Sequence, residues 1–503
     1  MMNKTFIPLL LATTLLAGCS VGPNYVRPHT AGSAAAPFIG AENAAVTRKA
    51  AIDQWWKLYD DPVLNRVVAD AIAANTDIRV AAARIDHARA MLRDARSNRL
   101  PTTGINASAQ RERLSGAQTL PGEAREGTVY DGGLSLSYEI DLFGRVSRGI
   151  EAAHGDTGAA QADGDAVRLA VIADTVRAYL DVTTSAEQLK VAQDTVALLD
   201  TSVRITGARV DVGRSDRLDV LRVMALRDQQ AALVPQIVAD RRAALLRLAT
   251  LTGRTPADLP ADLTLQVITP QPAVLIPVGD GAALIARRPD VRAAERRLAA
   301  ATARIGVATA ELYPHISLGG SIGSTALGGM NVLGDGASRW ALGPLISWTF
   351  PNTGAVRARI AAARADDAAS LAQFDGTVLI ALEETERALT RYARLRERIE
   401  MLARTRDEAQ RAARITLARQ REGRIDFLTV LDAQRTLASA ETDLVAARRD
   451  ATFAQVDLFR ALGRGWAEEL KPWTFVPQKI GVVSSTGSTA TSPPARSRMR
   501  SGL

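Results

Sequence analysis

The chain has 503 residues, of which 47% are hydrophobic and only 4% are aromatic, and its formal net charge is +8. A chain of this length can bury a sizeable core and ordinarily forms more than one domain. The excess of basic residues does not indicate nucleic-acid binding, because the arginines alternate with acidic residues instead of forming one basic run. Abundant alanine, leucine and charged residues with few aromatics are typical of long, closely packed helices.

The first 18 residues have the features of an export signal. Lys4 supplies a positive charge, and the apolar run that follows it is too short to span a bilayer. The run ends in LAGC, which resembles the lipobox of bacterial lipoproteins, where the cysteine is lipidated and becomes the first mature residue. Cys19 is the only cysteine, so no intramolecular disulfide can form. We expect a signal peptide over 1–18 and lipidation at Cys19; an ordinary signal peptide with an incidental cysteine is the alternative.

The second half of the chain repeats the landmarks of the first half. The sequence GRSDRLDVL, which begins at Gly213, returns as GRIDFLTVL at Gly423, 210 residues later. Three upstream landmarks return in the same order with a spacing of 213 residues: Asp77, Arg79 and Pro101 return as Asp290, Arg292 and Pro314. Landmarks in constant order indicate an internal duplication.

The duplication predicts how the chain is divided. We expect a first repeat over 62–253 and a second over 279–464, joined by a proline-containing linker over 254–278. An extended, lipidated segment over 19–61 precedes the repeats. The segment 465–503 follows them, and its end is expected to be disordered because it is rich in proline, serine and arginine.

Each repeat is expected to begin with a helix and a β-hairpin. In the first repeat the helix covers 62–98 and ends before Pro101, because proline disfavours helix at the residue before it. The hairpins cover 102–141 and 315–350. The strand LSLSYEID alternates strictly between apolar and polar residues, and HISLGGSI alternates likewise, which is typical of a strand with one apolar and one polar face.

Very long helices follow the hairpins, over 146–212 and 355–422. Apolar residues at seven-residue spacing indicate coiled-coil packing; they are Val191, Leu198, Ile205 and Val212. At 1.5 Å per residue, such a helix is roughly 100 Å long. Turns at Gly213 and Gly423 then lead into returning helices. After the signal peptide there is no run of eighteen apolar residues, so no membrane-spanning helix is expected.

Alternating strands offer another way to cross a membrane, a barrel that must close because lipid tolerates no open sheet edge. Four strands cannot close alone, since single-chain barrels need at least about eight. We therefore expect identical copies to pool their strands in a symmetric ring. The helices would continue from the barrel as a ring of coiled coils, and the whole assembly would be a duct.

The segments LLAGCSVGPNYVRP, YEIDLFGRV and LDAQR resemble the outer-membrane channels of tripartite efflux pumps, the TolC family. The resemblance is greatest to its NodT-like lipoprotein branch, attached to resistance-nodulation-division pumps, and covers 19–473. It implies a mainly α fold with membrane β: a homotrimer whose twelve-stranded β-barrel continues into an α-helical barrel. The linker 254–278 and the segment from 465 onward would lie in an equatorial belt.

The resemblance also implies a function. It predicts a passive exit duct, with no enzymatic activity and no cofactor or metal, that exports drugs or other small toxic compounds. The partners would be a periplasmic adaptor protein and an inner-membrane resistance-nodulation-division transporter. Because Ser20, not the aspartate of an inner-membrane retention signal, follows Cys19, a Gram-negative outer-membrane location is expected, with helices extending into the periplasm.

The resemblance places a periplasmic gate near the second turn. Leu428 would form an apolar plug and Asp432 a ring of carboxylates, which binds cations and excludes anions. Other possible residues of the gate are Arg222, Asp219 and Arg435, and Arg222 of a neighbouring hairpin is a candidate ion-pair partner of Asp432. In the alternative interpretation, Asp432 only pairs with Arg435 on an exposed helix face.

Other chemistry has weak support in the sequence. Gly319–Gly323 matches the G-x-S-x-G nucleophile pattern around Ser321, but lies in an expected hairpin, whereas that pattern needs a turn from strand to helix. The four histidines are scattered without metal-ligand spacing. Glu383 and Glu384 are expected to be solvated surface residues. The alternative to a duct is a structural or adaptor lipoprotein that bridges the periplasm without forming a pore.

Overall fold

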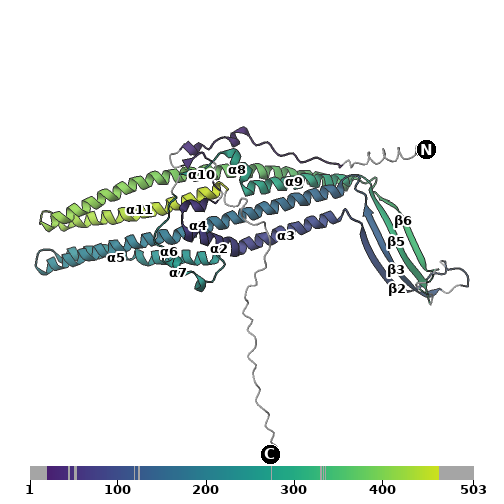
Figure 1. Cartoon of the computed structure of the whole chain (residues 1–503), viewed down its shortest axis with the longest axis horizontal. Coiled ribbons are helices and arrows are strands. Elements are labelled where there is room, and N and C mark those ends of the chain that lie inside the picture. The colour runs from purple at the N-terminus through teal and green to yellow at the C-terminus, as the bar shows by residue number, and fades with distance from the viewer. Residues whose placement is uncertain are drawn as a thin grey trace, which may run out of the picture.

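The computed structural model of the chain describes residues 20–42, 46–49, 52, 54–117, 119–122, 125–272, 275–328, 331, 334 and 336–463. The expected signal peptide, Cys19 and the segment 465–503 lie outside the described residues. The molecule is elongated: long helices run side by side along its length, and a four-stranded sheet lies at one end (Figure 1).

The main helices and strands occur in the same order in both halves. In the first half they are α2 (Pro62–Ala74), α3 (Thr76–Ser97), β2 (Thr102–Arg113), β3 (Glu126–Glu139), α4 (Arg145–Asp211), α5 (Arg217–Ala231) and α6 (Leu233–Leu251). In the second half they are α8 (Gly281–Arg287), α9 (Pro289–Ala310), β5 (His315–Leu327), β6 (Ser338–Ser347), α10 (Gly354–Arg421) and α11 (Phe427–Ala461). None of the described helices carries an apolar stretch long enough to cross a membrane.

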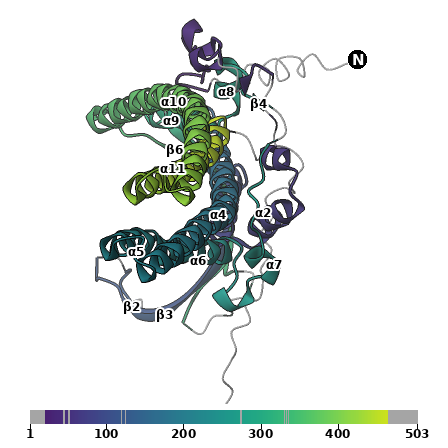
Figure 2. The ribbon, with the colours of Figure 1, turned by 90° about the vertical axis from the view of Figure 1, so that its left-hand side faces the viewer.

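Shorter elements flank these helices. They are η1 (Gly32–Ala35), η2 (Ile39–Glu42), β1 (Val46–Thr47), η3 (Trp55–Tyr59), η4 (Pro256–Asp258), α7 (Ala261–Thr264) and β4 (Ile276–Pro277). The helices form a curved layer, and many of the short elements gather on its convex side (Figure 2). The largest core cluster lies there, where Trp55 stacks on Phe459 with ring centroids 4.6 Å apart. We call the short elements and this core the belt.

Two expected helices are interrupted. The helix expected over 62–98 breaks at Asn75, whose side chain accepts the backbone N–H groups of Asp77 (2.8 Å) and Ile78 (3.3 Å) and so caps a new helix. The returning helix of the first repeat breaks at Ala232, between α5 and α6. Pro235 lies in the first turn of α6, where its missing N–H costs no hydrogen bond.

The two helical tips have nearly identical turns. Gly213 and Gly423 both have φ of 71°, a left-handed conformation that glycine adopts without strain. Each glycine N–H bonds the carbonyl three residues back, at 2.9 Å in both turns. Asp216 caps α5 and Asp426 caps α11. The local structure therefore repeats as the sequence does.

The sheet is antiparallel with the order β2-β3-β5-β6. Its register aligns one apolar row across all four strands: Ile105, Leu134, Ile322 and Trp340. These side chains are 87%, 44%, 61% and 79% exposed. The neighbouring row on the other face is small or polar: Gly104, Ser135, Ser321 and Ala341. The predicted alternation is thus confirmed, and the apolar face is open to its surroundings in the single chain.

Substitutions at Gly253 and Gly213 separate the cost of steric overlap from the cost of backbone strain. A Cβ on Gly253 would lie 2.7 Å from the carbonyl oxygen of Ala74, whereas a Cβ on Gly213 would meet nothing within 4 Å; both residues have positive φ. We expect Gly213→Ala to cost about 1 kcal/mol from strain alone. Gly253→Ala should cost about 2 to 3 kcal/mol because overlap is added. Thermal unfolding of the purified variants, followed by circular dichroism, measures the difference; equal losses would contradict the packing argument.

Candidate functional site

The tips of the two helical hairpins pack against each other. A small apolar cluster joins them and consists of Leu199, Val223, Leu226, Phe427 and Leu431. It contains residues of α4, α5 and α11, so the first hairpin contacts the second within one chain. The residues just after both turns are therefore held at defined positions relative to one another.

Four of the five residues proposed for the gate line one hollow of about 330 Å³ where the two tips meet. They are Arg222 of α5 and Leu428, Asp432 and Arg435 of α11. Leu428 is 49% exposed although it is a large apolar residue, and Asp432 is also exposed. Asp219 does not line the hollow but lies 3.7 Å from Arg222. The hollow thus contains an apolar side chain and charges of both signs.

The ion pairs considered for Asp432 are not formed within the chain. Arg222 pairs with Asp219, and no described residue forms an ion pair with Asp432. At Thr429, three residues before Asp432, the hydroxyl and the backbone N–H both donate to Asp426. These bonds, first of all that of the hydroxyl, lower the pKa of Asp426. Asp426 therefore stays ionised as the helix cap.

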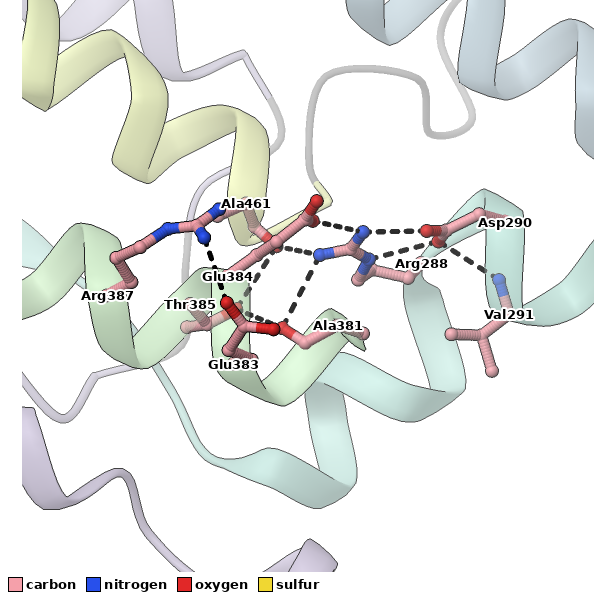
Figure 3. Close-up of polar contacts among 9 residues, drawn as sticks. All are labelled: Arg288, Asp290, Val291, Ala381, Glu383, Glu384, Thr385, Arg387 and Ala461. Atoms are coloured by element: carbon pink, nitrogen blue, oxygen red, sulfur yellow. Dashed lines mark hydrogen bonds and ion pairs between the residues drawn. The ribbon is translucent and has the colours of Figure 1, made fainter. Parts of the chain in front are cut away.

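The belt contains a buried cation that the sequence did not single out. Arg288, with 9% of its side chain exposed, lies between α8 and α9 and donates to the carboxylates of Asp290 (2.6 Å) and Glu384 (2.7 Å) (Figure 3). It also donates to the carbonyl oxygens of Ala461 (3.2 Å) and Ala381 (3.5 Å). Burial lowers the pKa of Arg288, but the two carboxylates outweigh burial and hold the pKa above its usual value.

This network corrects the expectation for the adjacent acids. Glu383 lies on the surface and pairs with Arg387 at 2.8 Å, as solvated residues do. Glu384, however, is the partner of the buried Arg288 and ties α10 to the start of α9. The only sequence feature that could have pointed to the buried Arg288 was the charged, proline-containing segment Arg287–Asp290, and such a segment does not by itself indicate burial.

Arg288 joins the end of α11 to the start of α9, and the first repeat has an equivalent joint made with a different side chain. Asn75, 213 residues before Arg288, donates to the carbonyl oxygen of Leu251 at 3.0 Å. Leu251 precedes Ala461 by 210 residues, so repeat-equivalent residues donate to repeat-equivalent carbonyl groups. At each joint a returning helix from the tips is tied to the helix that continues toward the sheet.

The polar face of the sheet carries an arginine–aspartate ion pair that connects two strands across a third. Arg339 of β6 donates to Asp131 of β3 at 2.8 Å, passing over β5, and the hydroxyl of Thr325 donates to the same carboxylate at 2.7 Å. Ser321, the residue of the nucleophile-like pattern, lies within β5 and not at a turn into a helix. In the described part of the chain no three His, Cys, Asp or Glu residues are grouped to hold a metal ion.

Comparison with known proteins agrees with this geometry. The family model "Outer membrane efflux protein" matches residues 67–254 and 282–464. The toluene efflux pump outer membrane protein TtgF of Pseudomonas putida is 31% identical over 475 residues, covering 92% of this chain and 97% of that protein. Nodulation protein T of Rhizobium leguminosarum bv. trifolii is 32% identical over 459 residues, covering 90% and 96%.

A solved structure of the outer-membrane channel OprN superimposes with a TM-score of 0.84 at 38% identity, covering 89% of this chain and all of that one. The chain therefore belongs to the outer membrane efflux protein family. Its fold is the mainly helical fold of outer-membrane efflux channels, and it is an outer-membrane component of an efflux system. The predicted resemblance, location and general function are confirmed.

Arg288 can be tested against an exposed arginine. We expect Arg288→Met to lower the free energy of unfolding by about 2 kcal/mol, because two buried carbonyl groups lose a charged donor and two half-exposed carboxylates lose their partner. Arg394, which pairs with Glu397 at 2.8 Å on the surface, is the matched control. Arg394→Met should change stability by less than about 0.5 kcal/mol. Chemical denaturation of both variants measures this, and equal effects would contradict a special role for Arg288.

Proposed function

We propose that three copies of the chain form a passive exit duct across the outer membrane and the periplasm. Support comes from the sheet: β2 and β6 lie at its edges, and its apolar face is exposed in the single chain. Open edges are not tolerated in lipid, so strands of neighbouring copies would complete the hydrogen bonding. Three copies would give a barrel of twelve strands. The duct itself would catalyse no reaction.

The helical part would form the tunnel. The helices α4 and α10 have 67 and 68 residues, which corresponds to roughly 100 Å each. They carry the chain from the sheet to the tips, far beyond the thickness of a bilayer. We infer that the concave side of the helical layer in Figure 2 faces the lumen and that the belt surrounds the tunnel.

The duct needs partners, because the described chain offers no source of energy for transport. We propose that a periplasmic adaptor protein and an inner-membrane resistance-nodulation-division transporter deliver the cargo at the tips. The cargo would be drugs or other small toxic compounds; the name of the relative TtgF associates that protein with toluene. Selection among compounds would occur mainly in the transporter.

We propose that acyl chains on Cys19 hold the mature N-terminus at the membrane surface. The next residue, Ser20, lies against Gly144, at the junction of sheet and helices, because a Cβ on Gly144 would lie 2.6 Å from the Ser20 hydroxyl. The N–H of Val21 donates to the carbonyl of Phe143 at 3.2 Å. This junction is where a membrane-inserted sheet would leave the bilayer, so attached lipid chains could reach the inner leaflet.

The proposed gate lies at the tips. In the trimer, Leu428 would form an apolar constriction, and Asp432 a ring of three carboxylates that favours cations. Arg222 and Arg435, in the same hollow, would be the partners that neutralise Asp432 when the tips are closed. The single observation that carries this proposal is the placing of Leu428, Asp432, Arg222 and Arg435 around one hollow.

Single-channel recording in planar bilayers tests the duct and the gate together. We expect small, cation-preferring pores from the native protein, and a conductance at least several-fold larger from the double variant Leu428→Ala, Asp432→Ala, because both the plug and the charge ring are removed. Leu218→Ala is the matched control: Leu218 is also 49% exposed and is the repeat equivalent of Leu428, but lies outside the hollow. Failure of every variant to form pores would favour a lipoprotein that only bridges the periplasm.

Lipid attachment has a separate test. Cells that express the protein and grow with radiolabelled palmitate should incorporate label into the native chain and not into Cys19→Ser, since the chain has no other cysteine. Ser20→Ala, which keeps the thiol, should be labelled normally. Equal labelling of Cys19→Ser would show that the lipobox interpretation is wrong.

A further inference from the structure

A second hollow, of about 480 Å³, lies in the wall of the helical layer beside Arg288. It occurs where α11 ends and α9 begins, both against α4 and α10. Small side chains from three helices leave the space open: Ala166, Ala170, Ala388, Ala454 and Ala461. The volume is within the range of small-molecule sites, about 300 to 1,000 Å³.

The hollow has more arginine than acid on its walls. Four arginines and three acidic residues line it, and two of the acids, Asp290 and Glu384, are engaged by the buried Arg288. The third, Asp457, is shared by Arg177 at 2.7 Å and by Arg391 at 3.8 Å. Arg460 forms no ion pair with any described residue. Among the described residues, the guanidinium group of Arg460 therefore has no acidic partner, and it lines the hollow together with the alanine-rich wall.

The hollow borders the belt core at Ala388, Ala454 and Ala461, but its charged walls point away from that core. Phe459 packs into the belt on Trp55, and Asp457, two residues earlier on α11, points about 200° around the helix from it. On α10 the same spacing separates Leu389 of the belt core from Arg387 and Arg391 of the hollow. The charged walls of the hollow thus face away from the belt, whose short elements lie on the convex side of the layer (Figure 2). If the proposed duct is correct, the opposite, concave side is the lumen, and these charged walls face it.

We propose that this hollow binds small amphipathic organic anions, an apolar body lying on the alanine wall and a carboxylate or sulfonate on Arg460, with Arg387 and Arg391 beside it. Guanidinium groups bind such oxyanions through charge-assisted hydrogen bonds, and an apolar wall adds affinity for the rest of the molecule. The site rests on the proposed duct only for its role, which is to hold anionic cargo at the wall, between the tips and the barrel, after the tips have opened and the carboxylates of Asp432 have moved apart.

Binding is tested with 4-iodobenzoate on the full-length protein in detergent. Equilibrium dialysis should show one site per chain, and Arg460→Gln should weaken binding roughly tenfold, the loss expected for one charge-assisted hydrogen bond. Arg394→Gln, outside the hollow, should bind like the native protein. Ala388→Leu keeps every charge but fills the hollow, so it should also weaken binding. The cation 4-iodobenzylammonium should not compete.

Crystals soaked in 4-iodobenzoate give the location through the anomalous signal of iodine, which should lie against the alanine wall near Ala388, because it is para to the carboxylate bound by Arg460. Equal binding by native protein, Arg460→Gln and Ala388→Leu would overturn the proposal, as would iodine bound only elsewhere or equal competition by the cation. Planar-bilayer recordings separate the two ideas: a protein that forms pores but fails these binding tests lacks the subsite, whereas one that binds the anion but never forms pores lacks the duct.

Discussion

The backbone groups at the edges of a membrane sheet impose the constraint from which the proposed assembly follows. Each chain contributes a sheet with two edge strands, β2 and β6, and an exposed apolar face. Lipid can cover the apolar face, but it cannot supply hydrogen bonds to the edges. Only further strands can do so, and copies of the same chain in a symmetric ring are the simplest source. The position of the helices is then set by the strands that they continue.

Long helices that are to line the proposed tunnel need contacts that keep them in register, and the belt provides such contacts. In each repeat the returning helix from the tips ends in a glycine with left-handed φ, 67° at Gly253 and 68° at Gly463. The helix that continues toward the sheet, α3 in one repeat and α9 in the other, is tied to the returning helix by a side chain at its start. Asn75 donates to the carbonyl of Leu251, and Arg288 donates to the carbonyl of Ala461. Arg288 adds ion pairs to Asp290 and Glu384 that Asn75 cannot make. The duplication therefore preserved the geometry of the joint while the chemistry of its two copies diverged.

Much of this arrangement could be predicted from the sequence because it rests on local patterns. Alternation along single strands predicted the two faces of the sheet, and the repeated glycine turns predicted the two tips. The break at Asn75 was missed, because an asparagine within an apolar periodic segment gives no strong signal until its partner, the carbonyl of Leu251, is known. Pro235 was overlooked as the start of α6 because the apolar pattern continues through it.

At the two hollows, too, some residues were predicted from the sequence and others were missed. Leu428 and Asp432 were selected through the resemblance, and the structure places them beside Arg222 and Arg435. Burial of Arg288 could not be read from the sequence, because its partners Glu384 and Ala461 are distant along the chain. The alanine-lined hollow was also missed, since small residues on helices are as consistent with close packing as with open space.

The number of copies in the assembly is the most direct test of the central claim, and native mass spectrometry of the full-length protein released from detergent micelles measures it. The account predicts one dominant species with three times the mass of the mature, lipid-modified chain, which persists at protein concentrations where a weak complex would dissociate. A protein that is monomeric throughout, although folded, would contradict the account, because its four strands would then have to exist in the membrane with both edges open.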